Sequence, residues 1–62
     1  MKEILALTTK DLMEDGVVYV GVRSSEKATL ITLSLEKSSD VEVGLSKEDT
    51  RTLIKALQNT ID

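Results

Sequence analysis

The sequence contains neither cysteine nor histidine among its 62 residues. Without cysteine the chain cannot form disulfides or thiolate metal sites, and without histidine it lacks the commonest metal ligand and the usual proton shuttle near neutral pH. Small domains compensate for a small core with disulfides, a bound metal or oligomerisation. Self-association is therefore the compensation that this composition favours.

Aromatic residues and long apolar runs are also scarce. Tyr19 is the only aromatic residue, so a core has to be built from valine, leucine and isoleucine. No stretch approaches the roughly 20 apolar residues of a membrane-spanning helix. The short apolar run Ile4–Leu7 falls below the roughly 7–15 residues of a secretory signal. We therefore expect a cytoplasmic protein with no membrane segment.

The overall charge is mildly acidic, with eleven Asp and Glu against eight Lys and Arg and a net charge of −3. This balance argues against non-specific nucleic-acid binding, whose affinity comes mostly from neutralised phosphates. A hydrophobic content of 40% is typical of a folded chain rather than a disordered one. We expect one domain over residues 1–62, and a domain of this size hides only about 60% of its unfolded surface.

Hydrophobic patterning predicts three strands joined by short polar links. The segments are rich in β-branched residues, and their side chains alternate between two faces. Short links between consecutive strands imply hairpins and hence an antiparallel meander. The predicted strands are Val17–Arg23, Ala28–Glu36 and Val41–Leu45.

A C-terminal amphipathic helix follows these strands. The hydroxyl of Ser46 is placed to cap the backbone amide of Asp49, in a sequence close to a capping box. The apolar stripe of this helix consists of Thr50, Leu53, Ile54, Leu57 and Ile61, at the spacing of one helix face. We predict an α+β fold in which the stripe packs on the sheet face that carries Val18, Ile31 and Val43.

The first sixteen residues admit two interpretations. The one we favour is a fourth strand within Lys2–Thr8, followed by a single helical turn that Thr9 caps and Gly16 closes. The alternative is a two-residue hairpin turn at Asp15-Gly16, with a strand running through Leu12 and Met13.

No motif for catalysis, cofactor binding or metal binding is present. The three glycines are isolated from one another, so the chain contains neither a phosphate-binding loop nor a G-x-S-x-G nucleophile elbow. Asp11, Glu14 and Asp15 lack the ligand order of a calcium loop, and we interpret them as a solvated acidic turn. We expect a protein that is not an enzyme.

The second face of the sheet suggests a partner. If the helix covers one face, Val17, Tyr19, Ala28 and Leu30 lie on the other, which is more apolar than a solvated sheet face usually is. Either the N-terminal segment folds over this face or a second copy pairs through it. We expect a homo-oligomer, with a dimer favoured, and a further protein partner. The candidate interaction residues are Val17, Tyr19, Leu30, Lys47, Arg51 and Lys55.

The leading hypothesis is a small protein-interaction or regulatory module, acting as an accessory or inhibitor-like protein, with Tyr19 as its best single anchor. One alternative is a nucleic-acid-associated regulator that uses the basic flank at positions 47, 51 and 55. The simpler interpretation of these three residues is an ordinary solvated helix flank. Another alternative is a small-ligand binder with a pocket at an oligomer interface, for which Arg23, Thr32 and Ser34 could supply polar groups.

Overall fold

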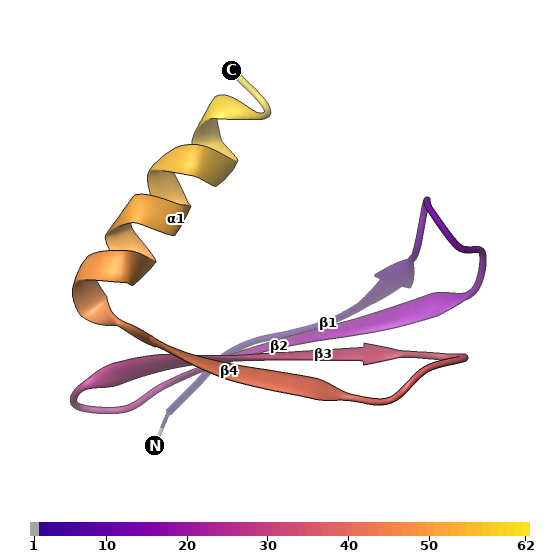
Figure 1. Ribbon diagram of the computed structural model, residues 1–62, viewed down its shortest axis with the longest axis horizontal. Coiled ribbons are helices and arrows are strands. Elements are labelled where there is room, and N and C mark those ends of the chain that lie inside the picture. Colours follow the sequence, from indigo (N-terminus) through magenta and orange to yellow (C-terminus); the bar gives the residue numbers. More distant parts are fainter. Residues whose placement is uncertain (1) are drawn as a thin grey trace.

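The computed structural model describes residues 2–62 as a four-stranded antiparallel meander followed by one helix (Figure 1). The sheet order is β1-β2-β3-β4, and each strand pairs antiparallel with the next. This confirms the predicted α+β fold, with the N-terminal segment as a fourth strand. The elements are β1 (Lys2–Lys10), β2 (Val17–Ser24), β3 (Ala28–Leu35), β4 (Val41–Ser46) and α1 (Lys47–Asn59).

The turn between β1 and β2 is organised by Asp11. Its carboxylate accepts hydrogen bonds from the backbone amides of Met13 and Glu14, at 2.8 and 3.3 Å. The amide of Asp11 donates to the carbonyl of Gly16 at 3.0 Å. Asp15 and Gly16 have positive φ angles of 60° and 112°, and Asp and Gly are among the residues that adopt this region most readily.

Both sequence interpretations of this segment are therefore partly wrong. Thr9 does not cap a helical turn, because it belongs to β1 and pairs with Val18. Leu12 and Met13 do not belong to a strand, since they lie in the turn and are each 90% exposed. A short-range side-chain hydrogen bond from Asp11 competes with helix and strand alike and stabilises the turn instead.

The strand register divides the sheet into two faces of different character. Residues directly opposite one another in an antiparallel pair share a face. Leu7, Val20, Leu33 and Val41 are opposite one another on successive strands, so they lie on the same face, and that face is apolar. Apart from Lys2 at one corner, the register places no charged residue of the described strands on this side. We call it the apolar face, and its aliphatic members are Leu5, Leu7, Val18, Val20, Val22, Ile31, Leu33, Leu35, Val41, Val43 and Leu45.

The helix α1 begins without a linker, because Ser46 both ends β4 and caps α1. Its hydroxyl accepts from the amide of Asp49 at 3.0 Å, as the sequence predicts. The helix packs against the sheet through contacts with β3 and β4. Its C-terminal part then rises away from the sheet (Figure 1). The angle at which α1 leaves β4 therefore decides how much of the apolar face it covers.

The single chain has little interior. Among the described residues no hydrophobic side chain is buried, and the buried positions are Gly21 and Thr29. A core assembled from one sheet face and one helix would normally bury several aliphatic side chains completely. Here the two apolar surfaces face each other without closing.

Candidate interaction surface

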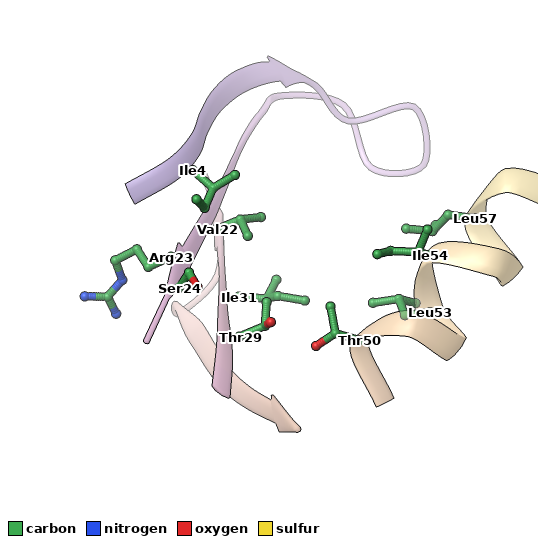
Figure 2. A pocket seen from close by; sticks show the side chains of 10 residues that line it. All are labelled: Ile4, Val22, Arg23, Ser24, Thr29, Ile31, Thr50, Leu53, Ile54 and Leu57. Atoms are coloured by element: carbon green, nitrogen blue, oxygen red, sulfur yellow. The ribbon is translucent and has the colours of Figure 1, made fainter. Parts of the chain in front are cut away.

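A cleft of about 350 Å³ separates α1 from the apolar face. Ile4, Val22 and Ile31 contribute to its sheet wall, and Leu53, Ile54 and Leu57 line its helix wall. Figure 2 shows these two sets of side chains pointing toward one another across the gap, while the guanidinium of Arg23 points away from it. The cleft is therefore lined mainly by aliphatic groups.

Two of the hydroxyl groups beside the cleft have partners within the chain. The hydroxyl of Thr50 donates to the carbonyl of Ser46 at 2.7 Å. The hydroxyl of Ser24 accepts from the ammonium of Lys47 at 3.1 Å. A small-ligand site usually has a few convergent polar groups that orient the ligand. With these hydroxyls engaged, the cleft suits aliphatic side chains better than a hydrogen-bonding ligand.

The apolar face and the helix stripe form one exposed hydrophobic surface. Leu33 and Val41 on the sheet are 42% and 54% exposed, and Ile54 and Leu57 on the helix are 58% and 57% exposed. Contiguous apolar patches of this kind on soluble proteins mark interaction sites. Sequence reasoning missed this surface, because it assumed that the helix would cover the face toward which it points.

The opposite face of the sheet, which we call the mixed face, carries Val17, Tyr19 and Leu30 as the sequence predicts. The N-terminal segment does not fold over it, because that segment extends the sheet as β1. The mixed face also carries the ion pair between Arg23 and Glu42. It is therefore more polar than the face that α1 overlooks.

The three polar residues considered for ligand binding are engaged with carboxylates. Arg23 pairs with Glu42, and the hydroxyl of Thr32 donates to the same carboxylate at 3.2 Å. The hydroxyl of Ser34 donates to Asp40 at 2.6 Å. These contacts are exposed, so each contributes about 1 kcal/mol or less, but they engage the polar ends of the three side chains on the mixed face.

Tyr19 lies over Gly21 on the mixed face, and this contact yields a prediction. A Cβ atom at Gly21 would lie 2.8 Å from the hydroxyl oxygen of Tyr19, so Gly21→Ala is expected to displace the ring. Because Tyr19 is the only aromatic residue, near-ultraviolet circular dichroism reports on this ring alone. The signal should fall by at least about half, because the displaced ring is no longer held in one orientation.

Gly44→Ala is the matched control for this prediction. Its Cβ would lie 3.3 Å from a terminal methyl of Leu30, which tests an added methyl on the same face without touching the ring. The tyrosine signal should stay unchanged in this variant. An unaltered signal in Gly21→Ala would show that Tyr19 does not depend on the glycine.

The basic flank of α1 is not uniform. The ammonium of Lys47 donates to Ser24 and to the carbonyl of Ala28, at 3.1 and 3.2 Å, and so ties the start of α1 to the turn between β2 and β3. Arg51 and Lys55 are exposed. Two of the three residues therefore remain available to a partner.

Metal and membrane sites receive no support from the part of the chain that is described. Over residues 2–62, no three His, Cys, Asp or Glu side chains gather closely enough to hold a metal ion. The helix α1 is too short and too polar to cross a membrane.

In comparisons with known proteins, no family model, no curated protein and no solved structure matches the chain.

Proposed function

We propose that the protein is a non-enzymatic interaction module that associates with a second copy of itself through the apolar face and α1. The observation that carries this proposal is an excess of surface. The chain exposes 5082 Å², whereas a compact monomer of 6.8 kDa is expected to expose about 3,950 Å². The excess is roughly 1,100 Å² per chain, more than the ~800 Å² that each partner buries in a standard interface and typical of an obligate homodimer.

The shape of the chain supports the same proposal. Its radius of gyration is 12.6 Å, whereas a compact domain of this length has a radius of about 11 Å. Its extents of 33 × 30 × 16 Å describe a thin, open molecule. Since no hydrophobic side chain of the described residues is buried, a second copy would supply the missing half of the core.

The absence of cysteine and histidine and the engaged hydroxyls near the cleft support binding rather than catalysis. Association through the apolar face would leave the mixed face outward. Tyr19 is only partly buried on that face and is then the candidate contact for a further protein. Such a contact is what an accessory or inhibitor-like module requires.

Light scattering tests the proposal directly. The molar mass at micromolar concentration is expected to be twice 6.8 kDa, because a single chain leaves its hydrophobic side chains in water. Circular dichroism on the same samples should show the strands and the helix. A mass of 6.8 kDa together with cooperative unfolding would contradict the proposal, since the single chain would then be sufficient.

A further inference from the structure

We infer that α1 of each copy packs on the open end of the apolar face of the other copy, so that the two chains exchange helices. This inference rests on the proposed self-association and specifies how it is built. The target is the far row, formed by Leu7, Val20, Leu33 and Val41, which are cross-strand neighbours at the end of the sheet away from the start of α1.

The direction of α1, and not its length, keeps it off the far row of its own sheet. With 13 residues, α1 is about 20 Å long, and the 6 residues of β4 from Val41 to Ser46 extend over about 17 Å, so a helix lying flat on the sheet could cover the far row. The helix starts from the Ser46 end of β4 and rises away from the sheet (Figure 1). The far row therefore lies beyond the part of the sheet that a chain's own helix overlooks.

Both the helix stripe and the far row are exposed in the single chain. Ile54 and Leu57 remain more than half exposed although they point toward their own sheet across the cleft (Figure 2). In the far row, Leu7 and Leu33 are 44% and 42% exposed. The helix stripe and the far row are thus both exposed to solvent in a single chain. In a dimer, the stripe of one copy would be buried against the far row of the other.

The charges beside the far row and on the helix are complementary. The far end of the sheet carries two adjacent turns, joined by a hydrogen bond of 3.1 Å from the amide of Glu36 to the carbonyl of Val17. These turns carry one basic residue, Lys37, and five acidic residues, Asp11, Glu14, Asp15, Glu36 and Asp40. A helix placed on the far row would bring the exposed Arg51 and Lys55 toward them, and opposite charges at the rim of an interface favour the register that joins them.

Two-fold symmetry limits this assembly to two chains. In an isologous interface each copy offers the same pair of surfaces, here the stripe and the far row. Both copies then use both surfaces, and no further copy can add through them. The inference therefore specifies a closed dimer.

Disulfide trapping tests the inference in the full-length chain, which has no cysteine of its own. One preparation carries Ile54→Cys and another carries Leu33→Cys; they are unfolded together, refolded as a mixture and oxidised. Because the two variants have the same mass, the Ile54→Cys chain is labelled with ¹⁵N. A covalent heterodimer is expected, with a mass between those of the labelled and unlabelled homodimers. Thr8→Cys replaces Leu33→Cys in the matched control: Thr8 is exposed on the mixed face, and its cross-linking to Ile54→Cys should be at least about tenfold weaker.

Three results would overturn the inference, and only the first of them would also overturn the proposed function. A third preparation carries both Ile54→Cys and Leu33→Cys in one chain. A disulfide within that chain, with a monomeric mass, would show that α1 closes on its own sheet and would overturn both the inference and the proposed function. A dimer that cross-links through Leu33→Cys on both chains, but not to Ile54→Cys, would show sheet-to-sheet packing and leave the proposed function intact. A native dimer in which Thr8→Cys traps as efficiently as Leu33→Cys would also overturn only the helix exchange.

Discussion

Leu33→Asp is expected to abolish both association and cooperative folding. Leu33 lies on the inner strand β3, opposite Val20 and Val41, and is 42% exposed in the single chain. Association would bury an aspartate there without a cationic partner. Burial of an unpaired polar group costs roughly 2–7 kcal/mol and that of a charge more, which is comparable with the whole stability of a small domain, about 5 kcal/mol.

The measurement combines light scattering with urea unfolding followed by far-ultraviolet circular dichroism. Thr8→Asp is the matched control. Thr8 lies on β1, is exposed, and is on the mixed face opposite Tyr19 of β2. Its free energy of unfolding should change by no more than about 1 kcal/mol. If Leu33→Asp keeps the wild-type mass and unfolding midpoint, the apolar face is not the interface.

Unfolding of the wild-type protein is expected to depend strongly on protein concentration. If two chains share one core, unfolding separates them, and dilution favours the unfolded state by mass action. Each tenfold dilution should lower the free energy of unfolding of the pair by about 1.4 kcal/mol. Urea titrations over a hundredfold range of concentration would therefore show a shift of about 2.8 kcal/mol.

The Thr8→Asp variant provides the control for this measurement as well, since a change on the mixed face should leave the concentration dependence intact. A midpoint that is the same at every concentration would mean that one chain folds alone. In that case the excess surface of the chain would not reflect a missing partner, and the proposed function would fail.

Local chemistry was sufficient to predict most of the fold. The alternation of β-branched residues in β2 and β3 and the cap at Ser46 depend on neighbours a few residues apart, and the structure confirms them. The turn after β1 was predicted less well, because Asp11 accepts from two successive amides and no apolar periodicity signals such a contact.

The candidate surface depended on geometry that is not local. Periodicity placed Val22, Ile31 and Leu53 on apolar faces, and the structure places all three beside the cleft. It also led to the expectation that the stripe would close on the sheet and leave the other face for partners. The direction in which α1 leaves β4, which depends on contacts between distant parts of the chain, leaves the helix-side face open instead.

By itself, the sequence determined which side chains share a face, because the repeats of strands and helices are intrinsic to the backbone. It also determined that no thiol or imidazole chemistry is available. Only the tertiary structure decided that Ile54 and Leu33 remain exposed, since burial depends on how far one element extends over another. That distance is a property of the assembled chain and not of any segment within it.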